Sequence, residues 1–389
     1  MAPYFYNLIR RFPNFLSENI LYLAAYHVDQ PSPAGVPMGL ISHFNYRNLP
    51  RLIQSSYALP TEIFASGTIF HQWAPLYALA TDLSAIFAIT PMAIDSFHQL
   101  CAENFSIYCP YLLGLKALPA HLPPLKISKN RQQHLRELDK NQLHSYRTLW
   151  PSLELACCWI SGPCELYAQQ LARAMGPEIK MVDGAYSATE GWMTVPLDTE
   201  HLGGVLHPGA HIVEFIEEGE EIHKKNLLQS WELKEGLRYE VFLTTAMGFI
   251  RYQLKDIVLC TGYLNRAPRL EFCCKSAQIR LNTCSISEQE IRDMIEKVEF
   301  QMQPYWYFAR NSSGNKLILV MDIENQPPAS MLEMMHNTLI SISETYAYGV
   351  KTGGIITPEL IQLPKEQLLG NRHAQTKPRM ISQQIINLK

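Results

Sequence analysis

The pattern of apolar and polar positions changes once along the middle of the chain. Residues 153–160 form an almost continuous apolar run that predicts a buried strand, residues 165–174 have the spacing of a helix, and residues 180–183 form a second short strand. A strand, a helix and a strand in this order predict a parallel crossover unit, whose ligands bind at the carboxyl ends of the strands. From residue 203 to residue 272, alternating strands are separated by turn residues, which predicts a small distorted barrel.

The flanking segments extend this α/β pattern. Residues 16–41 are expected to be strand and loop because three prolines exclude a helix there, and residues 49–101 are expected to be mainly helical. After Lys275 the pattern predicts two helices and two strands, namely a helix over 287–298, strands over 305–310 and 316–322, and a helix over 329–343. We therefore predict an α/β chain with a large domain, residues 1–274, and a smaller C-terminal α+β domain, residues 275–389.

Composition narrows the class of protein. With 47% hydrophobic and 18% charged residues among 389, the chain is globular, and its net charge of −3 gives no general attraction to nucleic acid or to an anionic membrane. The nine cysteines include no Cys-x-x-Cys pair, and the histidines lack the spacing of a zinc site. No signal peptide is recognised, and the most apolar stretch, residues 74–94, is interrupted by Asp82 and Pro91. We expect reduced thiols, a cytoplasmic location and no membrane partner.

Residues 184–190, Gly-Ala-Tyr-Ser-Ala-Thr-Glu, follow the second predicted strand and are the first candidate for chemistry. The small residues Gly184 and Ala185 would let a base or a phosphate approach the backbone. Thr189 offers a hydroxyl to phosphate oxygens, and Glu190 offers a hard oxygen to Mg²⁺. The alternative is an ordinary polar loop after a buried strand.

A second candidate lies some sixty residues further on. Residues 239–245 form an alternating strand, residues 246–248 a turn, and Asp256 follows. An aspartate here can accept hydrogen bonds from both hydroxyls of a ribose. The alternative is that Asp256 only caps a turn, as aspartates often do.

Taken together, these segments resemble the successive nucleotide motifs of the Gretchen Hagen family, the auxin-responsive acyl-acid amido synthetases of the acyl-adenylating superfamily. The resemblance rests on Tyr186–Glu190, Tyr239, Thr244-Thr245, Gly248, Arg251-Tyr252, Leu254, Asp256, Gly262-Tyr263, Asn265, Ala267-Pro268, Phe272 and Gln375–Arg379, in the order and rough spacing of the family. Residues 33–39 and 57–62 also fit, so the resemblance extends over nearly the whole chain.

The resemblance implies an acyl-adenylating large domain with sheet, helices and a small distorted barrel, and an enzyme that uses ATP and Mg²⁺ to join a carboxylic acid to an amino acid. It implies that Glu190 holds the metal and that Lys377, on the small domain, moves in to meet the α-phosphate or the acyl oxygen. The nucleotide would be bound by Gly184, Ala185, Tyr186, Ser187, Thr189, Arg251 and Asp256.

Some features depart from the family pattern. In the family, a Ser/Thr/Gly-rich loop wraps the ATP phosphates, and we expect this chain to begin after that loop. The only string similar to the loop, residues 65–68, is better interpreted as the start of a helix. Gln253, Lys275 and Ile286 stand where relatives usually carry other residues. Two hypotheses therefore stay open. The chain is a ligase, with its phosphate loop supplied by a separate chain, or it is a degenerate member that binds AMP, an acyl ligand or a protein partner without turnover.

Overall fold

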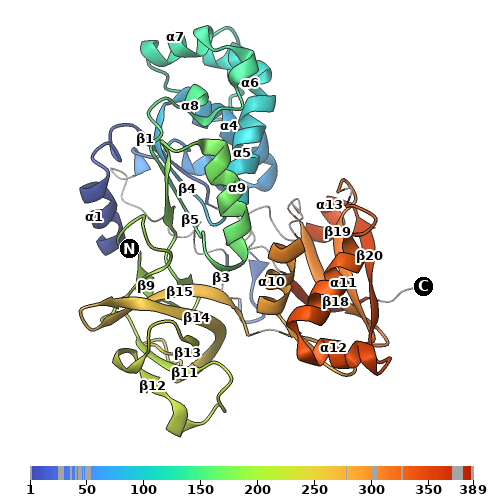
Figure 1. Cartoon of the computed structure of the whole chain (residues 1–389). Coiled ribbons are helices and arrows are strands. Elements are labelled where there is room, and N and C mark those ends of the chain that lie inside the picture. The colour runs from blue at the N-terminus through green and yellow to red at the C-terminus, as the bar shows by residue number, and fades with distance from the viewer. Residues whose placement is uncertain are drawn as a thin grey trace. The chain divides into compact units, whose positions relative to one another are not determined.

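The computed structural model describes residues 2–24, 30–35, 37–39, 42, 46, 48, 54–276, 278–298, 305–325, 327–369 and 380–386. The chain divides into two compact units. The first unit consists of Met1–Ile160, Cys164–Ala185 and Val195–Gly204, and the second of Ser161–Pro163, Tyr186–Thr194 and Val205–Lys389. This division does not follow the line drawn at residue 275, which stays a prediction. Figure 1 shows the elements of both units in sequence colours.

A four-stranded parallel sheet organises the first unit, in the order β1-β4-β5-β6. Its strands are β1 (Asn19–Tyr22), β4 (Leu83–Phe87), β5 (Leu155–Cys158) and β6 (Lys180–Asp183). Every residue of β4 and β5 is buried, as expected for a parallel sheet covered on both faces. The predicted strands over 153–160 and 180–183 and the helix between them are confirmed.

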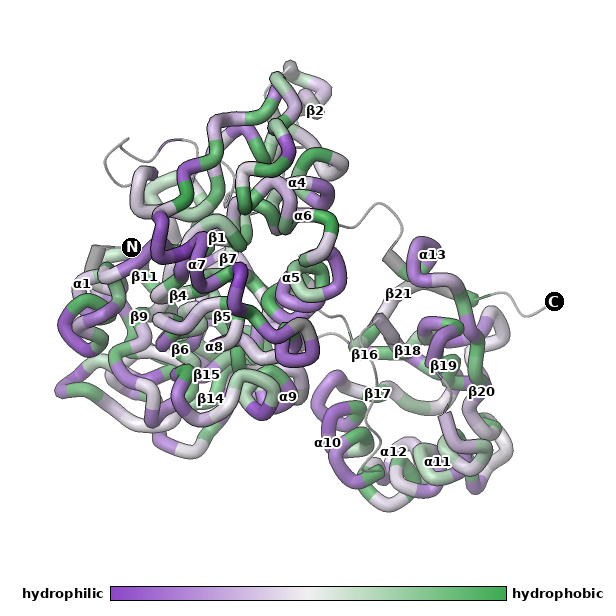
Figure 2. The backbone as a smooth tube through the Cα atoms, turned by 90° about the horizontal axis from the view of Figure 1, so that it is seen from above, coloured by the Kyte–Doolittle hydropathy of each residue, from purple (hydrophilic) through white to green (hydrophobic). Residues whose placement is uncertain are grey.

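Helices cover this sheet, and several begin at a side-chain cap. They are α1 (Ala2–Arg11), α4 (Gly67–Ala80), α5 (Pro91–Glu103), α6 (Phe105–Leu112), α7 (Lys129–Glu137), α8 (Tyr146–Leu149) and α9 (Glu165–Met175). Ser66 accepts a hydrogen bond from the Ile69 N–H at 3.2 Å, so the string at 65–68 is the helix start that its sequence predicted. Figure 2 shows the polar α7 in purple.

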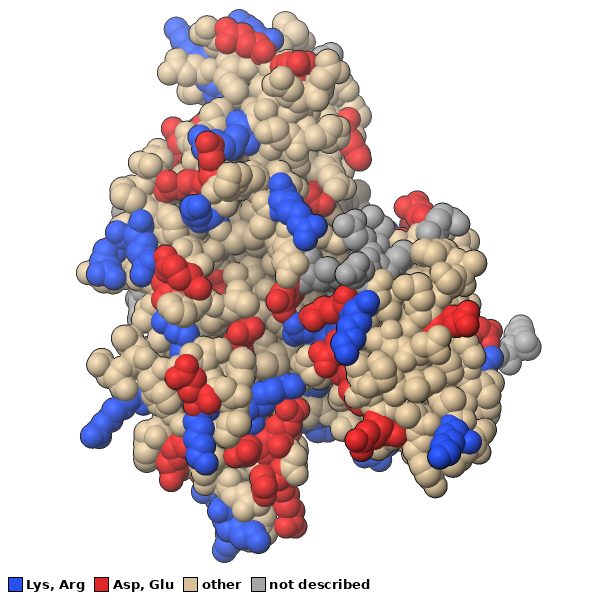
Figure 3. Space-filling model, viewed as in Figure 1, with Lys and Arg blue, Asp and Glu red and all other residues tan. Residues whose placement is uncertain are grey.

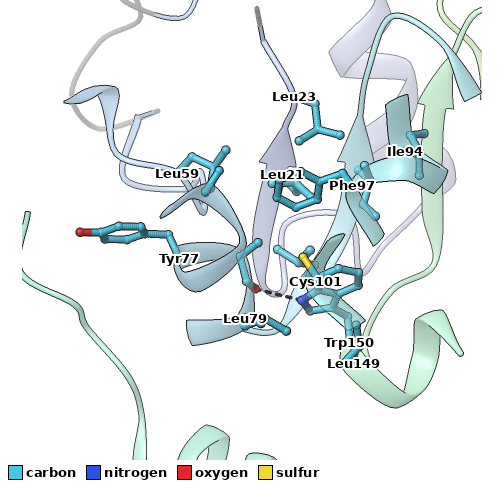
Figure 4. Packing of buried hydrophobic residues seen from close by; sticks show 14 of the residues in the cluster. Leu21, Leu23, Leu59, Tyr77, Leu79, Ile94, Phe97, Cys101, Leu149 and Trp150 are labelled. Carbon is cyan, nitrogen blue, oxygen red and sulfur yellow. Dashed lines mark hydrogen bonds between the residues drawn. The ribbon is translucent and has the colours of Figure 1, made fainter. Parts of the chain in front are cut away.

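The prediction that residues 49–101 are mainly helical missed one strand, because β4 lies between α4 and α5. A short run of five buried apolar residues cannot be distinguished from a buried helical segment by periodicity alone. The core beside this strand includes Trp150, whose indole N–H donates to the Ala78 carbonyl at 2.9 Å (Figure 4).

Most of a curled seven-stranded sheet, in the order β12-β11-β13-β14-β15-β10-β9, belongs to the second unit. Its strands are β9 (Thr194–Val195), β10 (Gly204–Leu206), β11 (Ile212–Glu217), β12 (Leu228–Gln229), β13 (Arg238–Thr244), β14 (Tyr252–Leu264) and β15 (Ala267–Lys275). Antiparallel pairing with several bulges bends the long strands β13, β14 and β15. This is the region where the sequence predicted a distorted barrel.

The rest of the second unit is the predicted α+β arrangement. A hairpin of β16 (Gln278–Arg280) and β17 (Ser285–Ser287) leads to α10 (Glu288–Val298). A four-stranded sheet follows, in the order β20-β19-β18-β21, with three helices. These elements are β18 (Trp306–Asn311), β19 (Lys316–Asp322), α11 (Met331–Ile342), α12 (Glu344–Lys351), β20 (Ile356–Leu363), α13 (Lys365–Leu369) and β21 (Ile381–Ile386).

The remaining elements are short. They are the strand pair β2 (Gln30–Pro31) and β3 (Pro37–Met38), the pair β7 (Ser187–Ala188) and β8 (Gly191–Trp192), and the 3-10 turns η1 (Thr61–Ala65), η2 (Lys140–Gln142), η3 (Gly162–Cys164), η4 (Lys224–Asn226) and η5 (Ser230–Glu232). Among the described helices, none combines the length and apolar character needed to cross a bilayer. Figure 3 shows acidic and basic side chains interspersed over the visible face, in keeping with the small net charge of −3.

Candidate nucleotide site

The small residues after β6 are explained by packing inside the first unit. A Cβ added at Gly184 would lie 3.0 Å from the Trp159 ring and 3.2 Å from the Cys158 backbone. The Trp159 indole N–H donates to the Ala185 carbonyl at 2.8 Å. Ala185 has a φ of 73°, which L-residues seldom adopt and which costs free energy. The chain therefore turns sharply after β6, as the sequence predicted. The role of Gly184 and Ala185 toward a nucleotide stays a prediction.

Ser187 to Trp192 form a tight hairpin of β7 and β8, with Thr189 and Glu190 as its turn. The segment is therefore a hairpin turn, and its role toward a nucleotide stays a prediction. Thr189 is exposed and Glu190 is half-buried at the tip. A Cβ added at Gly191 would lie only 2.6 Å from Nε2 of His211, so the hairpin packs directly on that ring.

Tyr186 and Asp256, 70 residues apart, meet inside the second unit. The Tyr186 hydroxyl donates to Oδ2 of Asp256 at 2.8 Å, and the Tyr186 ring stacks on Phe272 with centroids 5.8 Å apart. The Tyr186 N–H donates to Oγ1 of Thr194 at 2.9 Å, which fixes the start of the hairpin. Burial, followed by the Asp256 charge, raises the pKa of Tyr186 well above its usual value, so this phenol stays a donor.

The second oxygen of Asp256 is also engaged. Its Oδ1 forms an ion pair with Nζ of Lys275, which lies directly opposite on β15. The Lys275 ammonium has a second acceptor, the Leu254 carbonyl at 3.4 Å. Asp256 is only 2% exposed and lies within β14, so the alternative that it caps a turn is wrong. A ribose would have to compete with these partners for the carboxylate.

Arg251 is held by Glu214. Its guanidinium binds that carboxylate through two hydrogen bonds, Nε to Oε2 at 2.9 Å and Nη2 to Oε1 at 3.0 Å. The hydrogen bonds and the charge of Glu214 raise the pKa of Arg251. Arg251 has a φ of 49°, and its N–H donates to Oγ1 of Thr244 at 2.9 Å, so the turn and the ion pair fix each other. A contact of Arg251 with nucleotide stays a prediction.

The sequence interpretation missed one ionisable group near Asp256. Glu288, the first residue of α10, is buried, and burial raises its pKa to about 7 although the Lys275 backbone N–H and the charges of Arg292 and Lys275 act in the opposite direction. An acid in the first helical turn is a common sequence feature that favours the helix dipole. Nothing in the sequence pattern separates such an acid from a buried one.

The structure gives no direct geometry for two of the predicted roles, that of Lys377 and that of the metal. Lys377 lies outside the described residues. Within the described parts of the chain, no group of three or more histidine, cysteine or acidic side chains could hold a metal ion. Mg²⁺ commonly takes one or two carboxylates and completes its shell with phosphate oxygens and water, so Glu190 alone is compatible with a metal that arrives with a nucleotide.

Comparison with known proteins gives a consistent family. The model of the GH3 family central domain matches residues 204–275, the segment of the curled sheet. A putative indole-3-acetic acid-amido synthetase GH3.10 from Oryza sativa subsp. japonica is 25% identical over 154 residues, covering 38% of this chain and 32% of the relative. The jasmonoyl-L-amino acid synthetase JAR6 from Nicotiana attenuata is 28% identical over 157 residues, covering 38% of this chain and 27% of the relative.

The match thus spans about a third of the length of these curated relatives. Among solved structures, the GH3.15 acyl acid amido synthetase superposes with a TM-score of 0.80 at 16% identity, covering 97% of this chain and 74% of that chain. This likeness confirms the predicted α/β fold. The domain match, the relatives and the shared fold all agree with the resemblance to the GH3 family that the sequence motifs indicate.

Proposed function

We propose that this protein is an ATP-dependent acyl-acid amido synthetase, a ligase that activates a carboxylic acid as an acyl-adenylate and transfers the acyl group to an amino acid. The observation that supports it most is the hydrogen bond between Tyr186 and Asp256. It joins the two predicted nucleotide motifs, and Asp256 lies in the segment that matches the GH3 central domain. The relatives are named an indole-3-acetic acid-amido synthetase and a jasmonoyl-L-amino acid synthetase, which supports the same class of reaction.

The reaction would take two balanced steps. A carboxylate oxygen attacks the α-phosphorus of ATP, a mixed anhydride forms, and pyrophosphate leaves. The amino group then attacks the acyl carbon, the amide bond forms, and AMP leaves with the anhydride oxygen while the amine loses a proton to the medium. Both steps develop charge on phosphate, which cations and fixed donors stabilise, and both depend on close positioning of the reactants.

Each of the main site residues then has a proposed task. Asp256 would accept the ribose hydroxyls, and Tyr186, stacked on Phe272, would form part of the wall beside the base. Glu190, at the hairpin tip, would hold Mg²⁺, whose positive charge would offset the negative charge of the phosphates. Thr189 would donate to a phosphate oxygen. Lys377 is proposed, on the family resemblance alone, to meet the α-phosphate or the acyl oxygen.

A second function is a member that binds AMP, an acyl ligand or a protein partner without turnover. Two observations favour it, since both oxygens of Asp256 have protein partners and the guanidinium of Arg251 is bound by Glu214. We also propose a reducing, cytoplasmic location; the nine cysteines, all within the described residues, form no disulfide.

Acid-dependent exchange between ATP and pyrophosphate tests the proposal, with a panel of aromatic and aliphatic carboxylic acids and with amino acids added in a second assay for the amide. Exchange that requires both an acid and Mg²⁺, and that Asp256→Asn abolishes, supports a ligase. Binding of AMP by calorimetry without any exchange supports the non-catalytic function. We expect AMP to bind more tightly than ATP·Mg²⁺ to this chain; the reverse order would contradict that expectation.

A further inference from the structure

The carboxylate of Asp256 has two protein partners that differ in how easily they can leave. Tyr186 is buried, stacked on Phe272, and fixed through its own backbone. Lys275 has a side chain that is 50% exposed, against 3% for Asp256. A half-exposed ammonium regains hydration when it leaves, whereas moving the tyrosine would break a packed ring contact. Of the two partners, Lys275 is the one that an incoming ligand can replace.

Lys275 also has a second carboxylate within electrostatic reach. It is the last residue of β15, and its backbone N–H faces the carboxyl of Glu288 at the start of α10, which its ammonium also attracts. Arg292, on α10, is the other cation near Glu288, and its Nη1 donates to the Cys273 carbonyl at 3.2 Å. The Lys275 ammonium is therefore attracted by two acids, Asp256 of the curled sheet and Glu288 of the following helix.

We propose that the Lys275 ammonium pairs with the Asp256 carboxylate while no nucleotide is bound, and that a ribose diol displaces it from Asp256 toward Glu288. This proposal rests on the proposed function, because it takes Asp256 as the ribose acceptor. Lys275 is then a positioning residue: it keeps a buried carboxylate paired while no nucleotide is bound, which avoids the large cost of an unpaired buried charge.

The exchange has a structural consequence at the end of β15. The next backbone contact after the Asp256–Lys275 pair is the hydrogen bond from the Ser276 N–H to the Lys255 carbonyl at 2.8 Å. Lys255 has a φ of 55°, so this strand end already contains a residue in an unfavourable conformation. When Lys275 leaves Asp256, the Ser276 hydrogen bond loses its nearest support. Ribose binding is thereby linked to a weaker hydrogen bond between the Ser276 N–H and the Lys255 carbonyl.

Calorimetry with adenosine tests the exchange, because adenosine carries the ribose but no phosphate charge on which the lost ammonium could act. Lys275→Met removes the resident cation, so we expect adenosine to bind about 3- to 10-fold more tightly than to the wild type. Lys275→Arg keeps the cation and is expected to bind like the wild type. Asp256→Asn is expected to lose most of the binding, since the acceptor carboxylate is gone. Lys275→Gln, also uncharged, replaces Lys275→Met if that variant does not fold.

Hydrogen exchange gives a readout that a purely structural lysine would not change. Adenosine added to the wild type is expected to speed exchange of the Ser276 amide. Equal or weaker adenosine binding by Lys275→Met, with binding still lost in Asp256→Asn, would overturn the exchange and leave the nucleotide site in place. No binding of adenosine or AMP by the wild type or by Lys275→Met would overturn the exchange and the proposed function together.

Discussion

Replacing Glu288 with glutamine is expected to stabilise α10 at alkaline pH and to have little effect at acid pH. Glu288 is buried at the start of α10, and its pKa is raised from 4.5 to about 7. The groups that face it are Lys275 on β15, Asp256 on β14 and Arg292 on its own helix, and Glu288 in turn raises the pKa of Cys274. Glutamine has nearly the same shape and carries no charge, so the change removes the titration and keeps the packing.

The sign follows from the direction of the shift. Because the folded pKa lies above the unfolded value, folding favours the protonated carboxyl; that stability is fully present below pH 4.5 and is lost as the pH rises to about 7. Above pH 7 the buried carboxylate is charged, and the difference between the two pKa values corresponds to about 3 kcal/mol at most. We expect about 2 kcal/mol in favour of Glu288→Gln at pH 8 and much less at pH 5.

Native-state hydrogen exchange of the α10 amides measures this difference locally, which suits a chain of two compact units better than one global transition. Comparing variants at the same pH removes the intrinsic exchange rate. Glu296→Gln is the matched control, because Glu296 is on the same helix with a side chain that is 67% exposed. An advantage of Glu288→Gln that is equal at pH 5 and pH 8, or that Glu296→Gln reproduces, would refute the reasoning.

Three further substitutions test other parts of the structure. Asp256→Ala is expected to weaken AMP binding by about 1.5–3 kcal/mol, the range for hydrogen bonds to a charged acceptor, and an unchanged dissociation constant in a folded variant would contradict the ribose role. Gly191→Ala places a methyl 2.6 Å from the His211 ring and is expected to destabilise the second unit by about 1–3 kcal/mol; thermal unfolding should show partial recovery in Gly191→Ala/His211→Ala and no recovery if the hairpin is not packed there. Trp150→Phe removes the donor to the Ala78 carbonyl and is expected to cost about 1–3 kcal/mol in chemical denaturation, whereas a neutral effect would contradict the buried bond.

The sequence predicted the elements whose signal is local. The run of small and apolar residues that became β5, and the capped start of α4 at Ser66, are set by neighbours in sequence, and both are where they were expected. β4 was missed because burial on both faces of a parallel sheet removes the alternation that identifies a strand. The hairpin around Thr189 and Glu190 was not predicted because its β7 and β8 arms have only two residues each, too few to show a period.

Asp256 lies opposite Lys275 because of the register of the β14–β15 hairpin. The sequence indicates that register through the turn of the hairpin, although two bulges interrupt it. β14 and β15 are joined by the two-residue turn Asn265-Arg266, with Leu264 opposite Ala267, and Asn265 has the positive φ of 55° that such turns require. One bulge adds a residue to β14 near Cys260, which shifts the partners by one and would move Asp256 to the wrong neighbour.

A second bulge, between Ile257 and Val258 in the register, adds a residue to β15 and restores the original pairing. The partner of Asp256 is therefore the one that an unbroken hairpin from Asn265 would give. A single bulge would have placed an adjacent residue, Cys274 or Ser276, opposite the carboxylate and left it without a cation. The two compensating bulges bend the sheet and keep the buried charge paired, which explains how a strongly curled strand pair can carry an ion pair at its end.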